Sequence, residues 1–143
     1  MTSTIKNNVL KIQSLYPKIY FACHQDHIKA RSSTHKVSNR DNIILAHLFE
    51  GNLSYNKELA QHLNVSTATM SQALNNLVVL EFVQYVVDDN DERRSKYSLT
   101  TKGQLALQDS SVLNTEKLTN QLNKLTEQEQ LKVIEGLRLL ALI

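Results

Sequence analysis

Two clusters of polar side chains in this chain have the chemistry to bind nucleic acid. The first is a run of hydroxyl and amide residues, and no acidic residue lies between Ser66 and Leu80. Such side chains hydrogen-bond phosphates and base edges, although polar residues opposite an apolar stripe usually form a solvated helix face. The candidate contacts of this run are Ser66, Thr67, Thr69, Ser71, Gln72, Asn75 and Asn76.

The second cluster is cationic and lies further along the chain. Arg93, Arg94 and Lys96 could enter a minor groove or contact phosphates with their long side chains. Four acidic residues within 88–92 precede them and would repel DNA unless they point away or pair with the arginines. A solvated charged turn is therefore an equally good interpretation of these residues taken alone.

The N-terminal part holds residues suited to ligand or metal sensing. Tyr16, Tyr20 and His24 recur every four residues and share one face of a helix. Cys23 and His27 share an adjacent face at a spacing that suits two metal ligands. Tyrosines at this spacing are usually core or interface residues, and a lone buried cysteine is usually an inert apolar group. We rank a structural role first, ligand sensing second, and metal or thiol sensing below both.

Motifs typical of enzymes are missing from the sequence. It has no Gly-rich phosphate loop, no His-Glu-x-x-His pair and no Cys-x-x-Cys. The single cysteine, Cys23, excludes an intrachain disulfide and fits a reducing compartment. The N-terminus lacks a secretory pattern, and no apolar run approaches the about 18 residues of a membrane span. We expect a cytoplasmic protein that is not an enzyme, uses no cofactor and has no membrane partner.

The spacing of apolar residues indicates which elements carry these side chains. Spacings of three and four, with three glycines and one proline, predict a mainly helical chain. A first helix is expected over about 5–29, kinked or restarted at Pro17. Ser38 should cap a second helix that runs to about Glu50 and ends at Gly51. Its buried side is expected to hold Ile43, Ile44, His47 and Leu48.

The next segment has helix-turn-helix spacing. Ser54 could cap one short helix and Ser66 another, with a tight turn at Asn64 and Val65 between them. Small Ala60 lets the two helices approach closely, and Asn64 tolerates the left-handed conformation that such a turn requires. The polar run of the first cluster would lie on the second of these helices.

The pattern then becomes extended and predicts a β-hairpin with a charged tip. Residues 82–87 and 95–99 would form its strands, with the acidic run 88–92 between them. A hairpin directly after a helix-turn-helix is the wing of a winged-helix domain. The cationic cluster would lie at the tip of this wing and on its returning strand.

Two C-terminal helices are expected, one over about 101–121 and one from Thr126 to the end. Thr126 and Glu129 fit a capping box at the start of the second. The two helices carry more apolar surface than they can bury alone. An ordinary monomer core is one interpretation, but a helix-turn-helix protein on a palindromic site needs a twofold axis, so we expect a homodimer.

The wing carries a family signature. Asp91-Glu92-Arg93, followed after five residues by Leu99-Thr100-Thr101-Lys102-Gly103, resembles the wing motif of the MarR (multiple antibiotic resistance regulator) family. Upstream, Glu58-Leu59-Ala60 and Ser66-x-x-Thr69-Met70-Ser71 are similar to that family's two motif helices. The resemblance covers residues 40–103.

The resemblance implies a fold that is mainly α with a small β-hairpin wing. A winged helix-turn-helix DNA-binding domain, residues 36–103, would be flanked by dimerisation helices in residues 1–35 and 104–143. The homodimer would bind a pseudo-palindromic operator in double-stranded DNA, with Arg93 in a minor groove and Asp91 holding that arginine in place.

The resemblance also implies small-molecule effectors, often phenolic or aromatic anions, bound between the two regions near the first helix. Tyr16, Tyr20 and His24 are the effector candidates. The predicted function is a transcriptional regulator, a repressor that such an effector releases. The alternatives are a redox or metal sensor that uses Cys23, His24 and His27, and a winged-helix interaction module that binds no DNA.

Three residues depart from the family pattern. Gln72 stands where an arginine is common, Glu81 where a glycine usually ends the recognition helix, and Tyr85 where a further arginine often follows. These departures lower the positive charge of a chain whose formal net charge is only +2. We therefore expect modest nonspecific DNA affinity and a shallow salt dependence.

Overall fold

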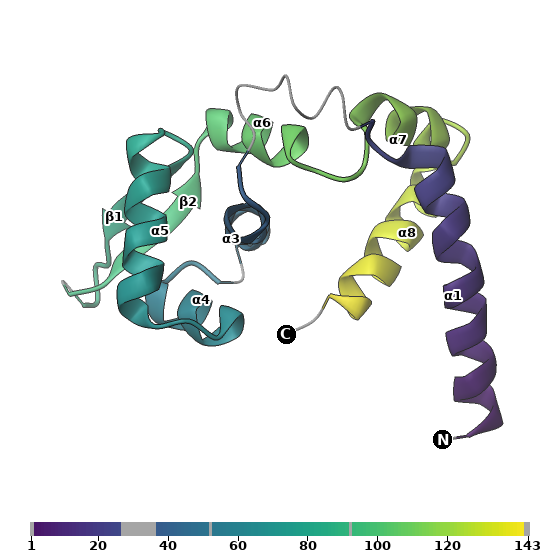
Figure 1. Cartoon of the computed structure of the whole chain (residues 1–143), viewed down its shortest axis with the longest axis horizontal. Helices are drawn as coiled ribbons and strands as arrows, with labels where there is room; N and C mark the ends of the chain where they lie inside the picture. The colour runs from purple at the N-terminus through teal and green to yellow at the C-terminus, as the bar shows by residue number, and fades with distance from the viewer. Residues whose placement is uncertain (1, 27–36, 52, 92, 142–143) are drawn as a thin grey trace. The chain divides into compact units, whose positions relative to one another are not determined.

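The computed structural model describes residues 2–26, 37–51, 53–91 and 93–141 (Figure 1). Its described part contains seven α-helices and a two-stranded antiparallel sheet. The predicted fold class, mainly α with a small β-hairpin, is confirmed. The chain forms two compact units: residues 1–27 with 112–143, and residues 28–111.

The first unit begins with the long helix α1 (Ser3–Cys23), which Thr2 caps by accepting a hydrogen bond from the Ile5 amide at 3.2 Å. The helix was predicted to be kinked or restarted at Pro17; it does not restart there, and the prediction that it reaches about residue 29 is wrong. α1 is continuous through Pro17, and the backbone turns extended at His24. There it forms an antiparallel bridge with Leu113, because pairing with this segment replaces further helical bonds. Residues 27–29 lie outside the described part of the chain.

The break before α7 explains another wrong prediction. A single helix over 101–121 was expected, but α6 (Thr101–Asp109) ends in the second unit and α7 (Thr115–Leu122) begins in the first. Asn114 opens the new helix, since its side chain accepts a hydrogen bond from the Lys117 amide at 2.9 Å. An asparagine in this role favours a helix start over a continuing helix.

The last helix of the first unit is α8 (Glu127–Leu140). Its capping box is present as predicted: Thr126 Oγ1 accepts from the Glu129 amide at 3.1 Å, and the Glu129 carboxylate accepts from the Thr126 amide at 3.0 Å. Among the described residues of this unit, Cys23 alone is buried. The apolar side chains of α1 and α8 therefore have little core of their own to pack into.

The second unit begins with α3 (Asn39–Glu50), whose predicted limits are confirmed. Ser38 Oγ accepts from the Asp41 amide at 3.2 Å, and Gly51 ends the helix with φ of 77°. The predicted buried face is wrong at one position. Ile43 is 45% exposed and Leu45 is fully buried instead, because α6 and β2 pack on the side of α3 that carries Leu45 and Leu48.

Two short helices, α4 (Asn56–Leu63) and α5 (Thr67–Val79), form the helix-turn-helix. Asn64 joins them in the left-handed conformation, with φ of 55° and ψ of 47°, as predicted. The cap predicted for α4 is wrong: Tyr55 precedes the helix and makes no side-chain cap. Ser54 is buried, and its carbonyl accepts from the Tyr97 amide at 2.8 Å, so this residue connects to the hairpin.

The hairpin consists of β1 (Val83–Val87) and β2 (Ser95–Leu99), paired in register from Val83–Leu99 to Val87–Ser95 (Figure 1). Helix α6 follows and packs against α3. A single apolar core holds this unit together, and its largest fully buried side chains come from α3, α4 and α5: Ile44, Leu45, Leu59, Met70, Leu74 and Leu77.

Candidate nucleic-acid interface

Helix α5 has one buried and one open face. Its apolar side chains Met70, Ala73, Leu74 and Leu77 are at most 2% exposed, so this face fixes the helix in the core. The opposite face carries the polar residues singled out from the sequence. Ser66, Thr67, Gln72, Asn75 and Asn76 are exposed, and Thr69 and Ser71 are half-buried. The unit thus presents neutral donors and acceptors to solvent along one helix.

The two half-buried residues already have partners. Ser66 Oγ accepts from the Thr69 amide at 3.0 Å and donates to Thr69 Oγ1 at 2.9 Å. Asn56 of α4 donates to Ser71 Oγ at 2.7 Å and to the Thr67 carbonyl at 3.2 Å. These bonds hold the start of α5 against α4, and Asn56 is a residue of this site that the sequence analysis did not identify.

The wing tip presents Arg93 to solvent. Its side chain is 93% exposed. Asp91 Oδ1 accepts from the Arg93 amide at 3.0 Å and from Arg93 Nε at 3.4 Å. These contacts restrain the arginine through its backbone amide and its Nε. Lys96 is exposed on β2.

Arg94 lies differently from its neighbour, because its guanidinium turns back onto α4. One of its terminal nitrogens donates to Glu58 Oε1 at 3.1 Å, and the group lies 3.7 Å from the centroid of the Tyr55 ring. The Arg94 backbone closes the wing turn, since its amide donates to the Asp91 carbonyl and its carbonyl accepts from the Asp88 amide, both at 2.9 Å.

Tyr55 adds a second link between α4 and the wing. Partial burial, and then the negative charge and hydrogen bonding of Asp88, raise the pKa of the Tyr55 hydroxyl above its usual value. The phenol therefore stays protonated at neutral pH and can donate to the Asp88 carboxylate. Tyr55 and Glu58 were missed because the sequence analysis placed the start of this helix at Ser54, and no local pattern pairs them with the wing.

A cleft of about 570 Å³ lies where α4, α5 and the wing meet. Its polar and cationic lining includes both groups of side chains that the sequence analysis proposed. The lining residues are Tyr55, Asn56, Lys57, Thr67, Ser71, Asp91, Arg93, Arg94, Ser95 and Tyr97. The structure thereby brings the start of the polar helix and the wing cations to one surface of the second unit.

The charge of this unit sets a limit on nonspecific attraction. Residues 37–111 contain six Lys and Arg but nine Asp and Glu. A region with net negative charge gains little from counterion release alone, so hydrogen bonds from α5 and the few wing cations must provide most of any attraction to DNA.

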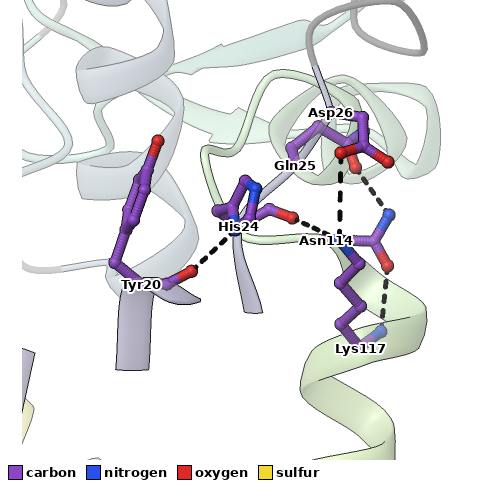
Figure 2. A network of polar contacts seen from close by, with 6 residues as sticks. All are labelled: Tyr20, His24, Gln25, Asp26, Asn114 and Lys117. Atoms are coloured by element: carbon purple, nitrogen blue, oxygen red, sulfur yellow. Dashed lines mark hydrogen bonds and ion pairs between the residues drawn. The ribbon is translucent and has the colours of Figure 1, made fainter. Parts of the chain in front are cut away.

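The candidate effector residues lie in the first unit, where Tyr20 and His24 come together. Their rings stack with centroids 4.9 Å apart, and His24 Nδ1 lies 2.9 Å from the Tyr20 carbonyl oxygen (Figure 2). Lys117 Nζ donates to the His24 carbonyl at 3.1 Å. Tyr16 is 61% exposed one helical turn earlier.

Of the metal and thiol candidates Cys23 and His27, the structure describes only Cys23. Cys23 is only 3% exposed, and His27 lies outside the described part of the chain. A buried thiol is a poor nucleophile unless its surroundings stabilise the thiolate. The prediction of a metal or thiol sensor therefore stays a prediction.

Residues 37–109, about half of the chain, match the model of the HxlR-like helix-turn-helix family. The chain belongs to this family. The HxlR-like match contains the whole winged unit from the start of α3 to the end of α6. Transcription regulators make up this family, a class that is generally not enzymatic. Comparison with curated proteins gives no significant match.

Solved structures show the same fold, that of MarR-type winged-helix regulators. MarR of E. coli in its apo form matches at 20% identity, covering 73% of this chain and 78% of MarR, with a TM-score of 0.50. A mutant of S. aureus MepR bound to an oligodeoxyribonucleotide matches at 23% identity, covering 73% of this chain and 78% of MepR, with a TM-score of 0.50. PcaV from Streptomyces coelicolor, in complex with its natural ligand, matches at 16% identity, covering 93% of this chain and 88% of PcaV, with a TM-score of 0.51.

Within the described residues, no helix has the length and apolar character needed to cross a membrane.

Proposed function

We propose that this HxlR-like regulator binds a pseudo-palindromic operator in double-stranded DNA and represses transcription there. The observation that carries the proposal is the shared surface of α5 and the wing. An acid-free helix face with Thr67, Gln72 and Asn75 exposed lies in the same compact unit as the exposed Arg93. The helix would read base edges in the major groove, and Arg93 would enter the adjacent minor groove.

The operator would be bound by two copies of the chain. In the first unit, apolar side chains of α1 and α8 are widely exposed, for example Leu10 at 65%, Phe21 at 82% and Leu137 at 59%. Exposed apolar surface of this extent favours association. A second copy would cover it and supply the twofold axis that matches two half-sites about one helical turn apart.

A small aromatic or phenolic effector would release the protein from DNA. The stacked rings of Tyr20 and His24 in the first unit support this assignment, since a further flat ring can stack against such a pair. PcaV, which shares the fold, was solved with its natural ligand. The dimer would have one conformation that fits the two half-sites and one that fits them poorly. An effector with higher affinity for the second conformation would raise its population and so release the DNA.

A winged-helix interaction module is the second candidate. The observation that favours it is the net negative charge of residues 37–111. Such a module would bind a protein partner and would not shift DNA.

A gel-shift titration against the intergenic DNA upstream of the gene, at two salt concentrations, separates the candidates. The DNA-binding proposal expects a salt-dependent shift that survives competitor DNA and weakens with added phenolic ligands. Absence of a shift there, together with an empty genomic binding selection, would reject DNA binding and leave the interaction module. Sedimentation equilibrium of the same protein tests the homodimer separately.

A further inference from the structure

Two histidines that play no part in the proposed DNA contacts face each other across α3 and α4. The ring centroids of His47 and His62 lie 4.6 Å apart, with the ring planes at 87°. We infer that this pair is a binding site for a divalent late first-row transition-metal ion, which would join α3 to the first helix of the helix-turn-helix. The inference is independent of DNA binding.

The geometry suits two imidazole ligands on one ion. Zinc–imidazole bonds are about 2.0–2.1 Å long, and a tetrahedral ion holds two ligand nitrogens about 3.3 Å apart. Rings 4.6 Å apart are within reach of this arrangement. In the edge-to-face contact the edge of one ring points at the face of the other, so one ring must turn before both can bind one ion. Exposed His62 is the ring that can rotate about its side-chain torsions until both ring edges point at the ion.

The local electrostatics favour a cation. Each histidine lies in the last turn of its helix, His47 in α3 and His62 in α4. The carbonyl end of a helix carries a partial negative charge, so two such ends at one place stabilise positive charge between them.

The two helices hold the ligands in place before the ion arrives. Leu48, next to His47, is 5% exposed, and Leu59, one turn before His62, is fully buried. Both belong to the apolar core of the second unit, so binding needs little movement of the backbone. The described residues contain no group of three metal-binding side chains, and water would therefore complete the coordination. Imidazole ligands favour copper, nickel and zinc over magnesium or calcium.

Calorimetric titration of the full-length protein with Ni²⁺ at pH 7.5 tests the site. Four variants are compared with the wild type: His47→Gln, His62→Gln, the double variant of both, and the control His35→Gln, which removes a histidine outside the pair. We expect His47→Gln or His62→Gln to lower the affinity for Ni²⁺ at least tenfold. The double variant should bind Ni²⁺ no more weakly than either single variant. His35→Gln should leave the affinity unchanged. Equal affinity in all variants, or dependence on only one histidine of the pair, would overturn the inference.

A measurement on the unaltered protein guards against variants that fold poorly. Substoichiometric Cu²⁺ should broaden the imidazole proton signals of His47 and His62 in NMR spectra before those of His24. Broadening that begins at His24 and spares the pair would also overturn the inference. Added metal should further raise the melting temperature of the wild type, because an ion that binds only the folded unit stabilises it.

Discussion

The guanidinium of Arg94 donates to Glu58 at 3.1 Å, although the two residues are 36 positions apart in the sequence. The contact fixes the turn at the tip of the wing to the first helix of the motif. Together with the stacking of Arg94 on Tyr55, it separates the two adjacent arginines by role. Arg93 is 93% exposed, whereas Arg94 is held against α4, an arrangement in which Arg94 would set where Arg93 is presented.

Glu58→Gln distinguishes positioning from direct contact by Arg94. If Arg94 positions the wing, Glu58→Gln should weaken operator binding several-fold, although it removes a negative charge. If Arg94 instead contacts phosphate, freeing it should strengthen binding. Fluorescence anisotropy with labelled operator measures the difference. The effect on the free energy of unfolding should stay within about 1 kcal/mol, because both side chains are 41% exposed and exposed ion pairs contribute little.

Arg93→Ala should weaken operator binding and lower the slope of log K against log salt by about one. The free energy of unfolding should change by no more than about 0.5 kcal/mol, because the side chain is 93% exposed. Lys124→Ala, which removes a cation from the first unit, is the matched control and should keep the wild-type slope. An unchanged slope in Arg93→Ala would remove Arg93 from the list of DNA contacts.

Glu81→Gly should stabilise the protein. Glu81 has φ of 66°, a left-handed conformation that costs a residue with a Cβ about 1–2 kcal/mol and costs glycine much less. After allowance for the flexibility of unfolded glycine, the gain should be about 0.5–1 kcal/mol in urea denaturation. Glu81→Ala is the control, since it removes the same charge but keeps the Cβ. A gain of equal size in both variants would assign the effect to charge.

Gly103→Ala should destabilise the winged unit by about 2–3 kcal/mol, in the range of overpacked cores. A Cβ at this position would lie 2.0 Å from the Phe82 carbonyl oxygen and 3.3 Å from Leu99 Cδ2, so backbone must move to admit it. Gly136→Ala is the matched control, because nothing lies within 4 Å of its added Cβ. The control should be neutral or stabilising by up to about 1 kcal/mol, as for alanine in a helix interior. Similar melting temperatures for Gly103→Ala and the wild type would contradict the close approach.

Stretches with short-range signals were predicted well from the sequence. Ser38, Ser66 and Thr126 each accept a hydrogen bond from the amide three residues ahead, and such bonds depend only on neighbouring residues. Asn64 could likewise be identified as the left-handed turn residue from its own side chain and the helices on either side. Alternation of apolar residues was enough to locate both strands of the hairpin.

Contacts between distant segments decided the rest. The end of α1 at Cys23 depends on pairing with the segment at Leu113, which a helical period cannot reveal. The same is true of Arg94 on Glu58 and of His47 beside His62, since each pair joins different elements. The sequence alone determined which residues are polar, cationic or capping, because those properties are local. Tertiary structure decided which of them meet, because that depends on how the helices pack into a shared core.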